Sequence, residues 1–306
     1  MKEKEQERRR ENITDIKYSL AKINLFLETV YLRKDSFHEI KSVLCEIQLA
    51  DILIFSLTES SNIKISCNSN ELKDSNNIIY KIACFLKDKY RVKRGLDISL
   101  RKYIPISGGL GGGSSNAALT IKTCNTLWNL HLSKREMHRI AARFGSDINF
   151  FLEGSIAYIT GKGEKVSKIS TKLNMENLLL VNPKISISSK EAYSWSSVKP
   201  EKRDKLRKLN DSLERNDISY LSKNLYNSLE DGAFTQYPVI KEIKEKMLDF
   251  GALGSLMSGS GSTVFGIFDL KHKMELAEKY FQNKNFWTYK TRIDIKNKKL
   301  LNNDVL

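Results

Sequence analysis

The sequence predicts an α+β protein, because strand-like and helix-like segments follow one another without the regular alternation of a doubly wound sheet. Residues 16–32 partly alternate apolar and polar side chains, which is typical of a strand. Shorter strand-like runs occupy 52–57, 63–67, 96–100, 156–160, 178–181 and 264–268. Apolar residues at helical spacing occupy 76–90, the residues after 113, and 133–145, and the pattern of 189–250 is mainly helical.

Two of these expected helices carry N-terminal signals. The side chain of Asn76 or Asn77 can cap the first. Ser133, with Glu136 three residues later, has the pattern of a capping box, so a helix is expected to begin after Ser133 and to end near Gly145. A polar stretch with weak periodicity at 165–177 indicates the boundary between two halves of the chain.

Composition limits the classes of function. The chain has 306 residues, 41% of them hydrophobic and 28% charged, an ordinary globular mixture that is long enough for two modest domains. It lacks the run of about 18 apolar residues that spans a membrane, and its charged N-terminus lacks the apolar stretch of a secretory signal. Four scattered cysteines without a Cys-x-x-Cys pair are typical of reduced thiols. We therefore expect a cytoplasmic protein that does not use a membrane.

The formal net charge of +15 raises the question of nucleic acid. The basic residues are spread along the chain rather than gathered into one stripe. In the densest stretch, 199–215, seven Lys or Arg are mixed with four Asp or Glu, as on a solvated helix surface. Nucleic acid is therefore not expected as a partner, and an anionic small-molecule substrate suits the charge better.

Glycine is concentrated at one place. Five of the six residues 108–113 are glycine, although the whole chain has only sixteen. Such a run weakens helices and strands, but it permits positive φ angles and close backbone approach. It follows a predicted strand and precedes a predicted helix, so backbone N–H groups and the helix dipole can converge on an anion. We therefore predict a phosphate-binding loop, to which the hydroxyls of Ser114 and Ser115 add ligands for phosphate or Mg²⁺.

Two common phosphate loops are excluded by spacing. A Walker A loop running from Gly108 to Gly113 needs Lys at position 114, where the chain has Ser114. A dinucleotide loop beginning at Gly109 needs glycine at the same position. A flexible linker stays open as the simpler alternative, although linkers are rarely flanked so closely by an apolar strand and an amphipathic helix.

The segment PISGGLGGGSSNAA, residues 105–118, resembles the phosphate loop of the GHMP kinases, a superfamily that phosphorylates small molecules. Three further segments resemble motifs of this superfamily in the same order: AKINLFL at 21–27, GSDINFF at 145–151 and MSGSGS at 257–262. Within the superfamily, the triple glycine before SSNAA is most similar to a branch whose substrate is a cytidine-diphosphate-linked alcohol. The resemblance spans roughly residues 21–268.

The resemblance implies a two-domain GHMP kinase fold with the active site in the cleft between the domains. We expect a disordered extension at 1–14, an N-terminal ATP-binding domain at 15–170 and a C-terminal domain at 171–306. The implied reaction is transfer of the ATP γ-phosphoryl group, with Mg²⁺, to a hydroxyl of a small-molecule substrate. The implied ATP-binding residues are Pro105, Gly108, Gly109, Leu110, Gly111, Gly112, Gly113, Ser114 and Ser115. The sequence identifies neither the protein ligands of the metal ion nor the oligomeric state.

Two residues match the catalytic positions of the family. Asp147 corresponds to the catalytic base, and its apolar neighbours Ile148, Phe150 and Phe151 would leave a carboxylate poorly hydrated and more basic. Without the family, Asp147 would be interpreted as a helix cap. Lys22 corresponds to the catalytic lysine, which can pair with Asp147 and neutralise charge on the transferred group. The simpler alternative for Lys22 is a solvated lysine on the polar face of a strand.

The resemblance also implies substrate-binding residues. Asn24 lies two residues after Lys22, hence on the same strand face. His38 corresponds to the residue that hydrogen-bonds the cytosine ring, and Phe37 stands where the family usually has Tyr. Ser189 stands where the family often has Thr near a substrate phosphate. Tyr193, one helical turn later, is a second candidate for stacking on the base.

Several alternatives stay open. The chain departs from the family at Leu20 and Asn149, where proline is usual, as well as at Phe37. These departures spare the ATP loop but leave another acceptor possible, such as a mevalonate-type alcohol. An RNA-binding protein on a related scaffold and an ATP-binding regulator without phosphoryl transfer are the other two hypotheses.

Overall fold

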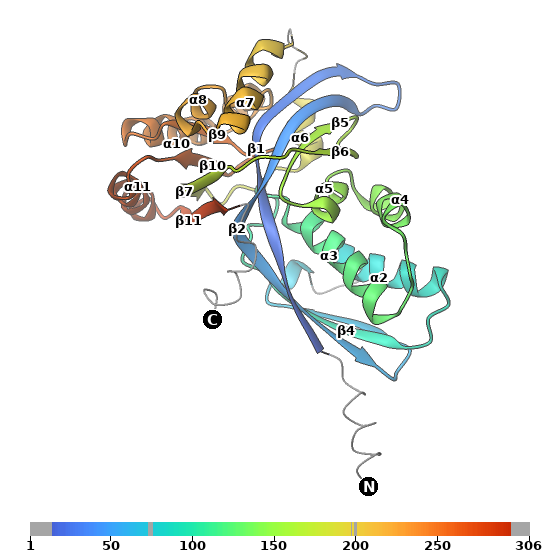
Figure 1. Ribbon diagram of the computed structural model, residues 1–306. Coiled ribbons are helices and arrows are strands. Elements are labelled where there is room, and N and C mark those ends of the chain that lie inside the picture. Colours follow the sequence, from blue (N-terminus) through green and yellow to red (C-terminus); the bar gives the residue numbers. More distant parts are fainter. Residues whose placement is uncertain (1–13, 73–75, 197, 199–200, 295–306) are drawn as a thin grey trace. The chain divides into compact units, whose positions relative to one another are not determined.

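A computed structural model describes residues 14–72, 76–196, 198 and 201–294 (Figure 1). The strands are β1 (Thr14–Leu32), β2 (His38–Thr58), β3 (Ile63–Cys67), β4 (Gly95–Arg101), β5 (Ile156–Thr160), β6 (Lys165–Lys168), β7 (Asn174–Asn182), β8 (Tyr226–Asn227), β9 (Gly254–Met257), β10 (Val264–Ile267) and β11 (Trp287–Asp294). The helices are α2 (Ile78–Lys89), α3 (Gly112–Leu127), α4 (Lys134–Phe144), α5 (Ile148–Glu153), α6 (Ser189–Ser194), α7 (Arg203–Arg215), α8 (Ile218–Lys223), α9 (Glu230–Gln236), α10 (Pro238–Asp249) and α11 (Lys271–Asn283), besides a 3-10 turn, η1 (Asn70–Leu72). This mixture confirms the predicted α+β class.

The chain forms two compact units, and neither is one continuous stretch of sequence. In the described residues, the first unit takes 14–20, 50–104 and 112–152, and the second takes 21–49, 105–111 and 153–294. The long strands β1 and β2 therefore contribute residues to both units. The predicted extension at 1–14 lies outside the described residues except for Thr14, at which β1 begins. The domain limits of 15–170 and 171–306, and the cleft, stay predictions.

The first unit is a sheet covered by helices. Strand β4 pairs antiparallel with the end of β2, with Phe55 opposite Ile98, and parallel with β3 on its other side. Helix α2 packs against α3 and β3, and α4 packs against α3. The apolar face of α2, with Ile79, Ile82 and Leu86, is fully buried. This helical spacing was the signal that predicted α2, and Asn77 caps it by accepting a hydrogen bond from the N–H of Ile79.

The second unit contains two sheets. In one, β1 and β2 run side by side, β8 pairs parallel with β1, and β5 pairs antiparallel with β2 (Figure 1). In the other, the strand order is β11-β7-β10-β9. Helix α11 packs against β7 and β11, whereas α10 packs against β9 and β10. Strands β9 and β10 pair with Val264 opposite Met257, so residues 258–263 form a tight connection between them.

The structure differs from the sequence-based prediction in three places. Strand β2 begins at His38, whereas only 52–57 were predicted, although in its first half the buried Cys45, Ile47 and Leu49 alternate with the partly exposed Glu46 and Gln48. Helix α3 begins at Gly112, inside the glycine run. Elements α5, β6, β9, α11 and β11 were not predicted, and β8 lies within the segment predicted to be mainly helical. The capping box of Ser133 and Glu136 is confirmed, and α4 ends at Gly145.

In the described part of the chain, no helix combines the length and the apolar character that crossing a bilayer requires.

Candidate active site

The backbone conformation of the glycine run changes from a turn to a helix at Gly112. Gly109 and Gly111 have φ angles of 77° and 70°, the left-handed region that glycine tolerates. A Cβ on Gly109 would lie 2.0 Å from the carbonyl oxygen of Ser258, so no larger residue fits. From Gly112 onward the backbone is helical, and a Cβ on Gly113 would meet nothing within 4 Å. The chain therefore passes from a tightly packed turn into a helix N-terminus whose second residue is open to an approaching ligand.

The polar residues that follow the glycines are not equally available. Ser115 is buried, and it accepts a hydrogen bond from the hydroxyl of Ser19 at 2.6 Å. Asn116 is buried as well, and its amide donates to Asp51 at 3.0 Å. Ser114 is partly exposed. Of the two serines predicted to reach phosphate or metal, the structure leaves Ser114 as the more accessible one.

Asp51 fixes this helix start within the first unit, and the sequence analysis missed it. Its side chain is fully buried and accepts hydrogen bonds from the N–H groups of Tyr103 and Ile104 at 2.8 and 2.9 Å. The ammonium of Lys102 lies 2.5 Å from the other carboxylate oxygen, which also accepts from Asn116. A charged residue between Ala50 and Ile52 in an apolar strand was the available signal, since such a charge is buried only when it is paired.

The second small-residue loop, 258–263, lies against the first glycine residues in the second unit. The hydroxyl of Ser258 donates to the carbonyl oxygen of Gly109 at 3.0 Å, and the N–H of Thr263 donates to that of Gly108 at 3.3 Å. A Cβ on Gly108 would lie 3.1 Å from Cβ of Pro105, another predicted ATP-binding residue. The two loops that the sequence singled out are thus one packed structure, although about 150 residues separate them.

Lys22 belongs to the same structure. Its side chain is 3% exposed, so it is not the solvated strand lysine of the simpler alternative. The ammonium donates to the carbonyl oxygen of Gly109 and to Oδ1 of Asn24, both at 2.6 Å, and its backbone N–H donates to Leu110 at 2.9 Å. Asn24 in turn donates to the hydroxyl of Ser42 at 2.9 Å. Lys22 and Asn24 therefore share one strand face, as the alternation predicted, and that face meets the glycine loop.

Asp147 lies in the first unit. It is partly exposed and directly precedes α5, whose residues Ile148, Phe150 and Phe151 are buried. A poorly hydrated carboxylate at Asp147 stays a prediction. The predicted pairing of Asp147 with Lys22 stays a prediction.

The two predicted base-binding rings are brought together. His38 begins β2 and Tyr193 lies in α6, and their rings stack with centroids 5.4 Å apart and planes inclined by 23°. Burial lowers the pKa of His38 below its ordinary value of 6.5, so the imidazole is neutral at neutral pH. Phe37 is exposed at 50%, and the ammonium of Lys162 lies over its ring at 4.5 Å. Ser189 is the exposed first residue of α6, directly after the capping residue Ser188.

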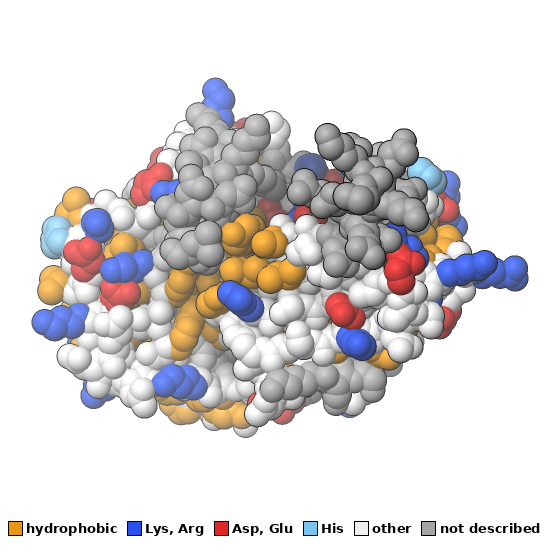
Figure 2. All heavy atoms as spheres, turned by 90° about the horizontal axis from the view of Figure 1, so that it is seen from below, with side chains coloured by type: hydrophobic (Ala, Val, Ile, Leu, Met, Phe, Trp, Pro, Cys, Tyr) orange, Lys and Arg blue, Asp and Glu red, His pale blue; other side chains and the backbone are white. Residues whose placement is uncertain are grey.

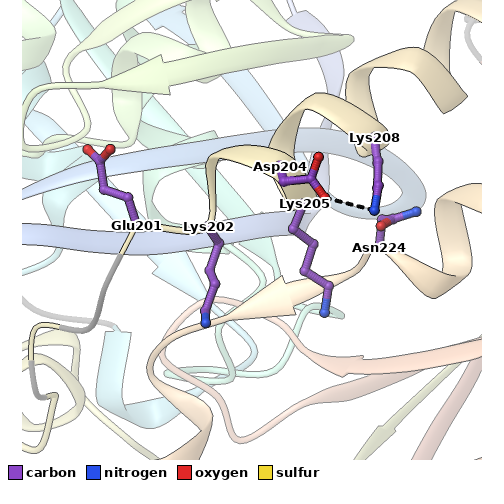
Figure 3. Close-up of a pocket in the computed structure, with 6 residues that line it drawn as sticks. All are labelled: Glu201, Lys202, Asp204, Lys205, Lys208 and Asn224. Atoms are coloured by element: carbon purple, nitrogen blue, oxygen red, sulfur yellow. Dashed lines mark ion pairs between the residues drawn. The ribbon is translucent and has the colours of Figure 1, made fainter.

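A polar recess of about 340 Å³ lies at the start of α7 in the second unit. Figure 3 shows its lining residues, Glu201, Lys202, Asp204, Lys205, Lys208 and Asn224. Lys208 pairs with Asp204 at 2.7 Å, whereas Lys202 and Lys205 extend to the same side without an ion-pair partner among the described residues. Burial, and then the neighbouring Lys244, lower the pKa of Lys205. None of the residues that the sequence assigns to the site lines this recess.

On the face shown in Figure 2, the charged side chains of the described residues are dispersed. In Figure 2, Lys and Arg side chains are scattered and interspersed with Asp and Glu rather than gathered into one stripe. The expectation that nucleic acid is not a partner stays a prediction.

Within the described ranges, no group of three or more His, Cys, Asp or Glu side chains is placed to hold a metal ion.

Two family profiles match the chain. That of the GHMP kinases N terminal domain matches residues 77–155, and that of the GHMP kinases C terminal domain matches residues 209–286. The first range contains the glycine loop and Asp147, and the second contains the loop at 258–263.

Relatives align along most of the chain. A Clostridium novyi protein named 4-diphosphocytidyl-2-C-methyl-D-erythritol kinase is 38% identical over 274 residues, which cover 89% of this chain and 97% of the relative. A protein of the same name from Thermoanaerobacter pseudethanolicus is 40% identical over 259 residues, which cover 84% and 88%.

Solved structures of kinases are similar to this chain over most of its length. A crystal structure of 4-(cytidine 5'-diphospho)-2C-methyl-D-erythritol kinase is similar with a TM-score of 0.77 and 26% identity, and it covers 91% of this chain and 99% of that one. The L. major mevalonate kinase in complex with R-mevalonate has a TM-score of 0.72 at 14% identity, covering 92% and 97%, and shows the fold alone. From the motifs, the fold and these relatives together, the chain belongs to the GHMP kinases.

Proposed function

We propose that this kinase transfers the γ-phosphoryl group of ATP to a hydroxyl of 4-diphosphocytidyl-2-C-methyl-D-erythritol, in the cytoplasmic synthesis of isoprenoid precursors by the non-mevalonate route. The observation that carries the proposal is the contact of the Lys22 ammonium with the carbonyl oxygen of Gly109 at 2.6 Å. This contact attaches a buried positive charge to the glycine loop, and phosphoryl transfer depends on such positioned charge.

The residues present fit a nucleoside triphosphate. The N-terminus of α3 offers backbone N–H groups and the positive end of a helix dipole, and the space beside Gly113 is open. We assign the phosphates to this helix start and to the residues predicted for ATP. Mg²⁺ usually takes most of its ligands from phosphate oxygens and water, with one or two from the protein. Ser114 is the accessible hydroxyl for that role.

The chemical step needs one base and stabilisation of charge. The acceptor hydroxyl oxygen forms a bond to the γ-phosphorus while the bond to the β-phosphate oxygen breaks, and ADP leaves. We assign the hydroxyl proton to the carboxylate of Asp147 and the stabilisation of the transferred group to the ammonium of Lys22. When bound, Mg²⁺ neutralises charge on the phosphate oxygens. Asn24 holds Lys22 in place and is assigned to the acceptor's polar groups.

The acceptor is proposed from the second unit's aromatic pair. His38 and Tyr193 present a stacked, partly buried ring pair of the kind that recognises a nucleobase. Relatives at 38% and 40% identity carry the name of a kinase with a cytidyl-bearing substrate. We assign Phe37 to the same subsite as an apolar platform, and Ser189 to a substrate phosphate. A mevalonate-type acceptor would leave this aromatic pair without a role, so it is not favoured.

A panel of acceptors tests the proposal. Release of ADP is coupled to NADH oxidation, and kcat/KM is compared for 4-diphosphocytidyl-2-C-methyl-D-erythritol, mevalonate, phosphomevalonate, homoserine and galactose at saturating Mg·ATP. The cytidyl compound is expected to exceed every other acceptor by at least about 1,000-fold, since a base subsite left empty loses its binding energy. A higher kcat/KM for any other acceptor would refute the assignment.

A further inference from the structure

The loop at 258–263 contacts Lys22, to which stabilisation of the transferred group is assigned, and the glycine loop, so whatever fixes this loop also fixes them. The backbone of Gly259 lies directly against Lys22: a Cβ at residue 259 would come within 2.8 Å of the ammonium nitrogen and 3.0 Å of the Gly109 carbonyl oxygen. Ser258 donates to that same carbonyl oxygen at 3.0 Å. A shift of the loop would therefore displace Lys22 and the glycine loop together.

One buried side chain binds the backbone of this loop. Asn227 is 3% exposed and lies in β8, where it pairs with Leu27 of β1. Its amide nitrogen donates to the carbonyl oxygens of Met257 and Gly259, both at 2.8 Å. Its amide oxygen accepts from the N–H of Leu229 at 2.9 Å. The two donors thus bind the backbone on both sides of Ser258.

This bonding pattern requires an asparagine. The amide supplies two N–H donors and an acceptor at one short reach, whereas a carboxylate of the same shape supplies acceptors only. Glu230 completes the fixation, because its carboxylate accepts from the N–H of Met257 at 2.9 Å and pairs with Lys244 at 2.6 Å. Met257 is therefore held at its nitrogen by Glu230 and at its oxygen by Asn227.

We propose that Asn227 is a positioning residue for phosphoryl transfer, acting through the backbone of Met257 and Gly259 on Lys22 and on the carbonyl oxygen of Gly109. The inference rests on the proposed function of Lys22. The buried asparagine is thereby expected to affect the rate of the chemical step, because small displacements of catalytic groups reduce rates by orders of magnitude.

The test replaces the donors without changing the shape. Asn227→Asp places a carboxylate against two carbonyl oxygens, so kcat is expected to fall at least about tenfold at pH 8, a larger change than any rise in KM for ATP. Burial beside carbonyl oxygens favours the protonated carboxyl group, which regains one donor. The deficit in kcat relative to the parent enzyme should therefore shrink as the pH is lowered toward 6, and a purely structural defect would not recover in this way.

Asn224→Asp is the matched control. Asn224 is also buried, at 7% exposure, but among the described residues its amide donates to the carbonyl oxygen of Tyr220 in α8, the helix that Asn224 caps, at 2.8 Å. Its kcat is expected to stay within about twofold of the parent. If Asn227→Asp does not fold, Ser258→Ala tests the positioning role instead, because it removes the hydroxyl that donates to Gly109. Its kcat is then expected to fall at least about fivefold.

The outcomes separate this inference from the proposed function. Parent enzyme that fails to turn over the cytidyl acceptor refutes the proposed function. With an active parent, a kcat of Asn227→Asp within twofold of the parent, or a deficit that is equal at every pH, overturns the positioning role. In the case decided by Ser258→Ala, an unchanged kcat overturns it.

Discussion

The imidazole of His38 and the phenol ring of Tyr193 stack on each other, with ring centroids 5.4 Å apart and planes inclined by 23°. One ring begins a long strand and the other lies in a short helix far along the chain. The tertiary fold, rather than local sequence, therefore creates this aromatic pair, to which the proposed function assigns the nucleobase of the acceptor.

Removing the tyrosine ring should weaken acceptor binding selectively. Tyr193→Ala is expected to raise KM for the cytidyl acceptor about tenfold, because base–aromatic stacking contributes about 1–3 kcal/mol, and to leave KM for ATP unchanged. Tyr193→Phe keeps the ring and should stay close to the parent. The control is Tyr280→Ala, which removes a ring contact with Phe250 at 5.4 Å elsewhere in the second unit. Equal KM values for the acceptor in both alanine variants would contradict the assignment.

Stability and nucleotide affinity should separate at Gly113. Gly113→Ala introduces a methyl group into open space in a helix, so the free energy of unfolding is expected to rise by up to about 1 kcal/mol. The same methyl group obstructs a phosphate bound at the helix start, so the Kd for ATP should increase about tenfold, measured by calorimetry. In contrast, Gly109→Ala should lose both stability and affinity, because its Cβ would overlap the carbonyl oxygen of Ser258. Unchanged ATP affinity in Gly113→Ala would place the phosphates elsewhere.

Lys22 should matter to the rate far more than another lysine of the same strand. Lys22→Met removes the ammonium bound to Gly109 and Asn24, and kcat is expected to fall at least about 100-fold, as for the loss of one charge-stabilising group. Lys17→Met is the control, since Lys17 is partly exposed and forms an ion pair with Asp15 at 3.0 Å. Both variants should fold, as judged by circular dichroism. The account of Lys22 fails if the two variants keep the same kcat.

Asp147→Asn distinguishes a catalytic base from a helix cap. Asparagine caps a helix about as well as aspartate does but does not accept a proton, so phosphoryl transfer should be abolished while the Kd for ATP stays within about twofold. Asp217→Asn is the control, because Asp217 caps α8 by accepting from the N–H of Tyr220 at 2.9 Å. If Asp147→Asn is as active as Asp217→Asn, then Asp147 is only a cap.

Local patterns predicted the parts of the site that have a local cause. The run of glycines indicated a phosphate loop, and strand alternation placed Lys22 and Asn24 on one face. The shared strand face is confirmed, since Lys22 donates to Asn24 and to the glycine loop, whereas phosphate binding by that loop stays a prediction. The capping box at Ser133 was equally local and is confirmed.

Contacts between distant segments left no such signal. Asp51 and Asn227 are single polar residues whose partners come from other elements, so no spacing rule identifies those partners, although the charge of Asp51 between two apolar neighbours marks it as a paired residue. The beginning of β2 was missed although Cys45, Ile47 and Leu49 alternate with Glu46 and Gln48, because the buried run at 42–45 interrupts the alternation before it. The interleaved units have the same origin, since β1 and β2 each contribute to both. Composition and spacing along the chain carry no record of this arrangement.

The most direct test of the central claim is a ³¹P NMR spectrum of the reaction of the purified protein with Mg·ATP and 4-diphosphocytidyl-2-C-methyl-D-erythritol. The account predicts a new phosphomonoester resonance on the acceptor that grows in a one-to-one ratio with ADP and is absent when the acceptor is omitted. ADP formed without that resonance, or no reaction by folded protein that binds ATP, would contradict it.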